Sequence, residues 1–296
     1  MATATAGSAA VQRLRLRTEL REARLAADLT QRQVADQMEW SPSKLLRIEA
    51  GEVGITVNDL RLLLTFYGVE DPGRVNGLLE LARGSRKMPF TEYRDIYPKD
   101  FLDFLAMEAS AWINRTFQSM VLPGLLQTEE YAAAIIRAYS PHESAEQVDR
   151  MVEARMLRQD VLDNEQAQFF FTLDESVIRR QVGGPKVMRA QLRQLAELAA
   201  RPRVNVMIQP FSLGAHAALA GPFTLFEFKE DVPTFVYLEN PRGNATISTA
   251  PEDAATYIDL FQDLEAKAIK EHVPEILLRV ADGVGSPQAD LIVPDA

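Results

Sequence analysis

Apolar residues recur at helical spacing through the first part of the chain. From residue 11 onward they fall every three or four positions, which places them on one face of an α-helix. Short polar or glycine-containing stretches interrupt the pattern repeatedly before residue 84. We therefore predict an all-α module of about five helices over residues 11–84, preceded by a small-residue tail at residues 1–10.

The starts of these helices carry capping signals. Thr30 is followed three residues later by Gln33, the spacing of a capping box in which two side chains satisfy backbone N–H groups reciprocally. Ser41 and Pro42 are preferred just before and at the first position of a helix, and Gly51 is suited to its end. Two short helices joined by a tight turn are thus predicted between Thr30 and Gly51.

The pattern changes after residue 84. A stretch of mixed charge containing two prolines, residues 85–99, predicts a linker, and residues 100–280 combine helical periodicity with short apolar runs typical of strands. We predict helices at residues 100–112, 128–139, 145–162, 185–200 and 251–268, and strands at residues 116–122, 169–173, 204–209, 223–228 and 234–238. Short connections between the late strands indicate a mainly antiparallel sheet. The predicted fold class is α+β, with a C-terminal tail at residues 281–296.

Composition changes this picture little. The 296 residues are 47% hydrophobic and 25% charged, as in soluble globular proteins, and they include no cysteine, which excludes disulfides and thiolate zinc sites. Neither a secretory signal nor an apolar run of about 18 residues is evident, so we expect a cytoplasmic protein without membrane contact.

Basic and acidic residues are unevenly distributed along the chain. Residues 1–88 hold 13 basic and 11 acidic residues, whereas the remainder holds 19 basic and 31 acidic residues. An acidic surface repels the phosphates of nucleic acid. Contact with DNA is therefore expected only from the N-terminal module.

The two short helices have the layout of a helix-turn-helix, in which the second helix enters the major groove of DNA. The inner side of this second helix is apolar and its outer side is polar and basic. Arg47 is suited to bind guanine, Ser43 to bind a base or a phosphate, and Gln31 in the preceding helix to bind a phosphate. An ordinary solvated helix face is the alternative interpretation. The residues predicted to contact DNA are Thr30, Gln31, Arg32, Ser41, Ser43, Lys44 and Arg47.

The stretches REARLAADLTQRQVADQM and SPSKLLRIEAG resemble the lambda-repressor-like, xenobiotic-response-element (XRE) class of bacterial regulators, and the resemblance covers residues 13–68. It implies a structural ion pair between Arg24, late in the first helix, and Glu49, at the end of the recognition helix. It also implies that Gln31 contacts a phosphate and that Ser43, Lys44 and Arg47 contact bases or the DNA backbone. The sequence departs from the class at Glu39, where the turn usually holds a glycine suited to a left-handed backbone conformation.

Much of the remaining chain resembles the C-terminal region of actinobacterial WhiJ-like and antitoxin-like regulators, most specifically through LPGLLQTEEYA at residues 122–132. The resemblance implies a regulator paired with a small BldB-like partner protein encoded nearby. The candidates for a partner or ligand contact are Leu122, Pro123, Gly124 and Gln127. The alternative is a structural loop in which Thr128 caps the following helix.

Other polar residues give no sign of catalysis or metal binding. His142, His216 and His272 lack the spacing of metal ligands, and no nucleophile motif is present. His216 lies in the small-residue segment FSLGAHAALAGPF, which either lines a ligand pocket or forms a wide hairpin. We therefore expect no enzyme activity, no cofactor and no metal.

Three functional hypotheses follow. The first is a homodimeric transcriptional regulator that reads a two-fold related double-stranded DNA operator and whose C-terminal domain senses a small partner protein or a ligand. The second is an antitoxin-like protein that chiefly holds a small cognate partner and autoregulates its operon. The third, an enzyme formed by residues 100–280, has no motif in its support.

Overall fold

The computed structural model describes residues 9–49, 53–84, 90–229, 232–239 and 245–285. These residues separate into two compact units, with the boundary after Ser110. The predicted linker, at residues 85–99, lies on the N-terminal side of this boundary. The described part of that stretch includes a 3-10 helix, Thr91–Tyr93, and the first unit also contains α6 (Lys99–Glu108).

The predicted all-α module is confirmed in the described residues of the first unit. Its helices are α1 (Ala9–Ala26), α2 (Gln31–Gln37), α3 (Pro42–Glu49), α4 (Val57–Phe66) and α5 (Pro72–Gly84). Thr30 caps α2 in the predicted capping box with Gln33. Thr56 caps α4, because its hydroxyl accepts the backbone N–H of Asp59 at 3.1 Å. The predicted end of α3 at Gly51 lies outside the described residues.

Aliphatic side chains from successive helices form the core of the first unit. On α3, Leu45 and Ile48 are buried against this core, and α3 packs on both α1 and α2. Full burial of such a side chain stabilises the fold by about 1.5–3 kcal/mol. The inner face of α3 is therefore fixed by packing, and only the opposite face is available to solvent.

The second unit is built on a sheet whose described strands follow the order β3–β2–β1–β4–β5–β6. The strands are β1 (Ile113–Gln118), β2 (Gln168–Asp174), β3 (Val204–Gln209), β4 (Phe223–Glu227), β5 (Phe235–Glu239) and β6 (Ala245–Ser248). β1 and β3 both pair in parallel with β2, whereas β1–β4, β4–β5 and β5–β6 are antiparallel. The prediction of an α+β fold with a mainly antiparallel sheet is confirmed.

The parallel half of the sheet and strand β6 were not predicted. Parallel neighbours require a long crossover connection, and helices supply it here. The crossover helices are α7 (Glu129–Tyr139) and α8 (Ala145–Leu157) between β1 and β2, and α9 (Glu175–Arg179) and α10 (Pro185–Ala199) between β2 and β3. The late strands follow one another through shorter connections and pair antiparallel, as predicted.

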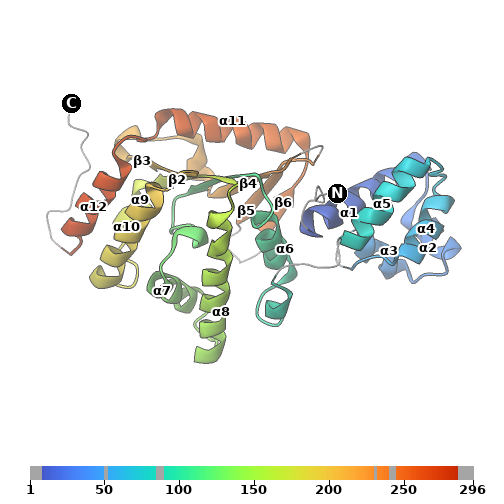
Figure 1. Ribbon diagram of the computed structural model, residues 1–296, viewed down its shortest axis with the longest axis horizontal. Helices are drawn as coiled ribbons and strands as arrows, with labels where there is room; N and C mark the ends of the chain where they lie inside the picture. The colour runs from blue at the N-terminus through green and yellow to red at the C-terminus, as the bar shows by residue number, and fades with distance from the viewer. Residues whose placement is uncertain (1–8, 50–52, 85–89, 230–231, 240–244, 286–296) are drawn as a thin grey trace. The chain divides into compact units, whose positions relative to one another are not determined.

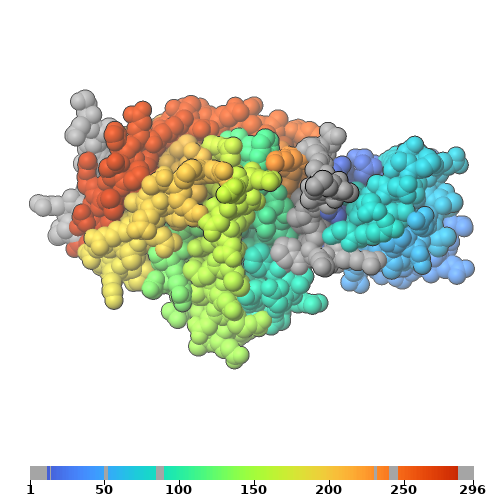
Figure 2. Space-filling view, in the orientation of Figure 1, coloured from blue at the N-terminus to red at the C-terminus, as the bar shows by residue number. Residues whose placement is uncertain are grey.

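Helices cover both faces of the sheet, as Figure 1 shows: α11 (Pro251–Lys267) lies along one face, and α7, α8, α10 and α12 (Val273–Gly283) lie on the other. α10 and α12 pack side by side, and Figure 2 shows them adjoining at the surface. α12 was not predicted, and it runs beyond residue 280, where the domain had been expected to end.

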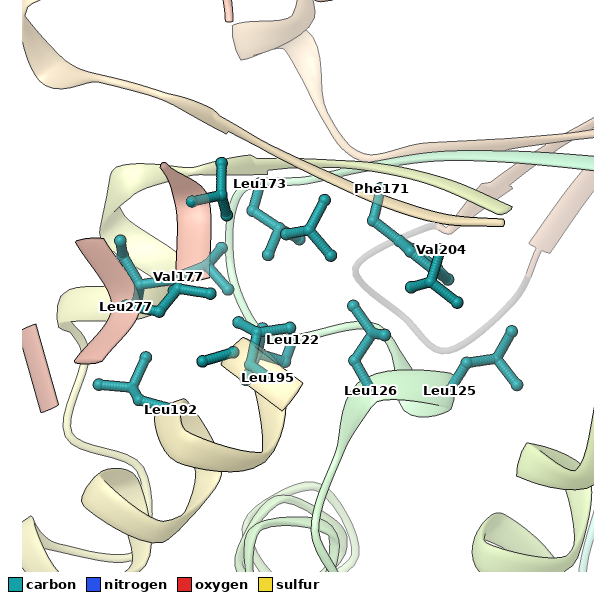
Figure 3. Packing of buried hydrophobic residues seen from close by; sticks show 14 of the residues in the cluster. Leu122, Leu125, Leu126, Phe171, Leu173, Val177, Leu192, Leu195, Val204 and Leu277 are labelled. Atoms are coloured by element: carbon teal, nitrogen blue, oxygen red, sulfur yellow. The ribbon is translucent and has the colours of Figure 1, made fainter. Parts of the chain in front are cut away.

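Each face of the sheet buries its own apolar cluster. Phe117 and Phe261 belong to the cluster on the α11 side. The larger cluster on the opposite face includes Phe171, Leu192 and Leu277, which converge from strand and helices in Figure 3. Because both faces are covered, β2, β4 and β5 carry near-continuous apolar runs, whereas the central strand β1 buries three polar side chains in addition to Phe117.

Candidate nucleic-acid interface

The turn between α2 and α3 holds the two helices in a fixed relation. Glu39 adopts a positive φ of 53°, the left-handed conformation that a glycine would take without strain. The backbone N–H of Trp40 donates to the carbonyl of Ala35 at 2.8 Å, which closes the end of α2. The Trp40 ring is partly buried against the core, so the residue after the turn is anchored by packing.

The residues predicted to contact DNA lie at the starts of α2 and α3 and along the outer side of α3. Ser41, Ser43 and Arg47 are exposed, whereas Lys44 is partly covered. At the start of α2, Thr30 and Arg32 are exposed and Gln31 is half-buried. The exposed face of α3 is therefore polar and basic, while its buried face is apolar.

Leu46 is an exposed residue on α3 that the sequence analysis did not single out. Its side chain is 51% exposed, next to Arg47 and one turn after Ser43. Adjacent apolar residues of a helix can both be buried, as Leu63 and Leu64 are on α4, so the sequence does not show that Leu46 is exposed. An exposed apolar side chain on this face is suited to contact a thymine methyl group.

A buried ion pair joins α1 to the end of α3. Arg24 Nε donates to Glu49 Oε1 at 2.7 Å and Arg24 Nη2 donates to Glu49 Oε2 at 3.1 Å, a two-pronged geometry. Arg24 Nη1 also donates to the carbonyl of Leu29 at 2.7 Å. The guanidinium thus fixes the C-terminal end of α3 and the segment before α2 at once.

Gln31 belongs to the same network. Its side-chain Nε2 donates to Glu49 Oε2 at 2.8 Å, so the residue predicted as a phosphate contact also orients the end of α3. An amide group has a second N–H, which leaves one donor for a phosphate oxygen. Contact with DNA stays a prediction for Gln31, and the hydrogen bond to Glu49 restricts the direction in which its amide points.

Lys44 has two partners within the first unit. Its Nζ lies 3.1 Å from Asp59 Oδ2, at the start of α4, and 3.9 Å from the centroid of the Trp40 ring. Both the lysine and the aspartate side chains are partly exposed, at 38% and 28%. The ammonium is therefore held between a carboxylate and an aromatic face beside the exposed surface of α3.

Tyr67 packs in the core near the ion pair. Burial raises the pKa of its hydroxyl, and the nearby Glu49 carboxylate acts in the same direction. Among the described residues, no hydrogen-bond partner is found for this buried hydroxyl oxygen. The side chain accordingly acts as a large apolar group with a polar atom that the core does not satisfy.

The second-unit candidates around residue 122 form a structural loop. Leu122, Pro123 and Gln127 are buried, and Gly124 is partly covered. Gln127 Nε2 donates to the carbonyl of Leu122 at 2.7 Å, and Gln127 Oε1 accepts from Arg155 Nη1 at 2.8 Å. The side-chain amide is thus satisfied inside the unit at both its polar atoms.

Neighbouring glutamines complete this network. Gln191, fully buried on α10, accepts the backbone N–H of Thr128 at 2.7 Å and donates to the carbonyl of Leu126 at 2.7 Å. Gln159 donates to the carbonyls of Gly124 and Gln127 at 2.9 and 2.8 Å. Thr128 caps α7, because its hydroxyl accepts the backbone N–H of Tyr131. The capping interpretation of this stretch accounts for its geometry.

His216 is half-buried in the segment between β3 and β4. Its ring meets Phe117 edge-on, with centroids 5.8 Å apart and planes at 87°. The segment contains two short 3-10 helices, Phe211–Leu213 and Ala217–Ala220. It is not a hairpin, because β2 and β1 lie between β3 and β4 in the sheet. Within the described ranges, no group of three acidic or histidine side chains is arranged to hold a metal ion.

Two family models match the chain. A helix-turn-helix domain matches residues 15–76, and a domain of unknown function, DUF5753, matches residues 101–272. No curated protein and no solved structure matches the chain. In the part of the chain that the structure describes, no helix is long and apolar enough to cross a membrane.

The helix-turn-helix match contains α2 and α3 with all the predicted DNA contacts, and it supports a DNA-binding regulator. It does not distinguish the XRE class, and the actinobacterial group likewise stays a prediction. The second match begins inside α6 and covers the sheet of the second unit. Since that match spans more than half of the residues, the chain belongs to the DUF5753 family and carries a helix-turn-helix domain before the family's domain.

Proposed function

We propose that the protein is a sequence-specific transcriptional regulator that reads double-stranded DNA with the exposed face of α3. The observation that carries this proposal is the division of α3 into two faces. Leu45 and Ile48 hold the helix in the core, while Ser43, Leu46 and Arg47 are exposed along its other side. A helix anchored in this way presents side chains to base edges without losing its own packing.

Each exposed side chain has a suitable target in the major groove. Arg47 can donate two hydrogen bonds to O6 and N7 of guanine, and Ser43 can bind a base edge or a phosphate. Leu46 can contact a thymine methyl group. Arg32, exposed near the start of α2, is placed to bind a phosphate and so to set the register of the protein on DNA.

The second unit acts in this proposal by binding and not by catalysis. Its net negative charge disfavours contact with the DNA backbone. Several large apolar side chains on its surface are available to a small partner protein or to a second copy of the chain; they are Met120, Tyr139, Leu157, Phe211 and Leu219. A homodimer would place two α3 helices on a two-fold related operator, and a partner would alter DNA affinity as far as it distinguishes free from bound states.

The proposal is tested by selecting bound duplexes from a random-sequence pool with the full-length chain. Arg47→Ala should weaken binding to the selected duplex by about 1–3 kcal/mol and relax the base choice at one position, because one bidentate contact is lost. Arg83→Ala is the matched control, since Arg83 is an exposed arginine of the same unit on α5 and pairs with Glu80.

The proposal would be contradicted outright if the selection enriched no DNA sequence. Equal effects of Arg47→Ala and Arg83→Ala would contradict the assignment of α3 as the reading helix. Partner binding is examined separately, by co-expressing the tagged chain with the proteins encoded beside it. A co-purified protein that changes the affinity for the selected duplex supports the regulatory role of the second unit.

A further inference from the structure

The ion pair between Lys44 and Asp59 places a negative charge beside the face of α3 that is proposed to read DNA. Asp59 lies in the first turn of α4, and its backbone is fixed by the Thr56 cap. The separation of 3.1 Å between Lys44 Nζ and Asp59 Oδ2 lies within direct hydrogen-bonding distance. Trp40 covers another side of the ammonium at 3.9 Å from its ring centroid.

We propose that Asp59 and Trp40 make Lys44 a base-reading residue by disfavouring its contact with phosphate; this inference rests on the proposed function. Asp59 and Trp40 are positioning residues in this scheme, because they act on DNA through Lys44. The family resemblance implied that Lys44 contacts bases or the DNA backbone, without distinguishing the two.

The preference follows from charge. A phosphate is an anion, so it approaches Lys44 only against the repulsion of Asp59 or by displacing that carboxylate. A base edge such as guanine O6 or N7 is neutral and carries no such repulsion. An ammonium has three N–H donors, so it can keep Asp59 and still donate to a base.

The restricted conformation of the Lys44 side chain also favours contact with a base. A lysine side chain loses rotamer entropy when it is ordered. The carboxylate and the ring already restrict the Lys44 ammonium in the protein itself, so less of this loss remains to be met on binding DNA. Non-specific binding, which depends on mobile cations finding phosphates, gains nothing from a lysine held in this way.

The decisive variant is Asp59→Asn, measured in the full-length chain with the selected duplex and with a shuffled duplex of equal length. Removing the carboxylate releases Lys44 to phosphate. The dependence of log Kd on log salt should therefore steepen by about 0.9 for each bound protomer, and affinity for the shuffled duplex should rise about fivefold to tenfold at 0.1 M salt. The ratio of specific to non-specific affinity should fall by a similar factor.

Three matched variants separate this mechanism from simpler ones. Glu70→Gln removes an exposed negative charge elsewhere in the unit and should leave the salt dependence near that of the wild type. Asp59→Glu keeps the carboxylate and should restore the specificity ratio. Lys44→Ala combined with Asp59→Asn should lose the gain in non-specific affinity. A thermal unfolding curve verifies that each variant is folded.

The inference is overturned if Asp59→Asn and Glu70→Gln have the same salt dependence. It is also overturned if the gain in non-specific affinity persists without Lys44, because the effect would then come from Asp59 alone. In both cases the wild type still selects a duplex, and the proposed function stands. Failure of the wild type to select any duplex overturns the proposed function and, with it, this inference.

Discussion

The first unit joins its helices through a buried ion pair, whereas the second unit joins a loop to a helix through neutral amides. Arg24 and Glu49 connect α1 to the end of α3, and their side chains are only 9% and 5% exposed. In the second unit, Gln191 bridges the backbone of residues 126 and 128 from α10. The Arg24–Glu49 pair and the Gln191 side chain are both nearly inaccessible to water, but only the first of these two links is made by charged side chains.

The two networks differ in the free-energy cost of removing one of the interacting side chains. A charge left without its partner in a poorly hydrated site is strongly unfavourable, whereas an amide that loses a partner leaves only unsatisfied dipoles. Removing either charged residue should therefore disturb the orientation of α3, the helix proposed to read DNA. The Gln191 side chain fixes a loop without a charge of its own, so its contribution to stability should depend little on salt.

The largest expected effect comes from Glu49→Ala. Breaking the buried pair should lower the free energy of unfolding of the first unit by about 3 kcal/mol or more, because Arg24 and Gln31 lose their shared acceptor. Urea unfolding followed by fluorescence measures it, with Trp112→Phe as the background so that Trp40 alone reports on this unit.

The control for Glu49→Ala is the combination of Arg24→Met with Glu49→Leu. Replacing both charges by apolar groups of similar volume often leaves stability nearly unchanged. Equal losses in the single variant and in this combination would contradict the idea that an unpaired charge causes the effect, and would point to lost packing instead.

The next effect concerns Gln191→Ala in the second unit. The backbone N–H of Thr128 and the carbonyl of Leu126 lose a buried partner, so the free energy of unfolding should fall by about 2–3 kcal/mol. Unfolding followed through Trp112 in a Trp40→Phe background reports it. Gln194→Ala is the matched comparison, since Gln194 makes one longer bond of 3.3 Å to the carbonyl of Gln127 and should lose less than half as much. If the loss of unfolding free energy in Gln191→Ala varied with salt concentration, the hydrogen bonds of Gln191 would not act as bonds between neutral groups.

The smallest effect distinguishes two buried tyrosines. Tyr131 accepts the backbone N–H of Leu122 at 3.2 Å, so Tyr131→Phe should cost about 1 kcal/mol. Tyr67 has no such partner among the described residues, so Tyr67→Phe should be neutral or slightly stabilising. The same two fluorescence backgrounds measure both changes, and a loss at Tyr67 equal to that at Tyr131 would contradict the comparison.

The same two tyrosines are expected to change the stability of the protein at alkaline pH. Burial raises the pKa of both hydroxyls in the folded state. Below the unfolded value of about 10 their full contribution to stability is present, and above it the unfolded chain releases protons that the folded chain retains. Stability should therefore fall as pH rises past about 10, and Tyr67→Phe should reduce that fall in the first unit.

The capped helix starts and the inner face of α3 could be predicted from the sequence because they depend on neighbouring residues, whereas the helices predicted at residues 100–112 and 145–162 end earlier, at Glu108 and Leu157. Caps such as Thr30 and Thr128 act within three residues, and a helical period is local. The parallel pairing of β1 with β2 could not be predicted, because it joins segments separated by two helices. Strand β6 is short and carries only Ile247 as a large apolar residue, so its pattern is too weak to predict.

The candidate site was predictable in its residue types but not in its contacts. The outward position of Arg47 follows from helix geometry, whereas the pairing of Lys44 with Asp59 depends on how α3 packs against α4. The same limit applied to Gln127. It was a candidate for a partner or ligand contact, but tertiary packing buries it and satisfies its amide inside the unit.

The central place of β1 bears on how the second unit is made on the ribosome. β1 is among the first segments of that unit to be synthesised, yet its antiparallel neighbour β4 starts at Phe223. At typical rates of synthesis, β1 waits on the order of 5–20 seconds with an unpaired edge. The residues of the helical first unit precede β1 in the chain, so this unit can fold during that interval. Nascent chains of this protein are therefore expected to carry a folded helix-turn-helix domain before β1 pairs with β4.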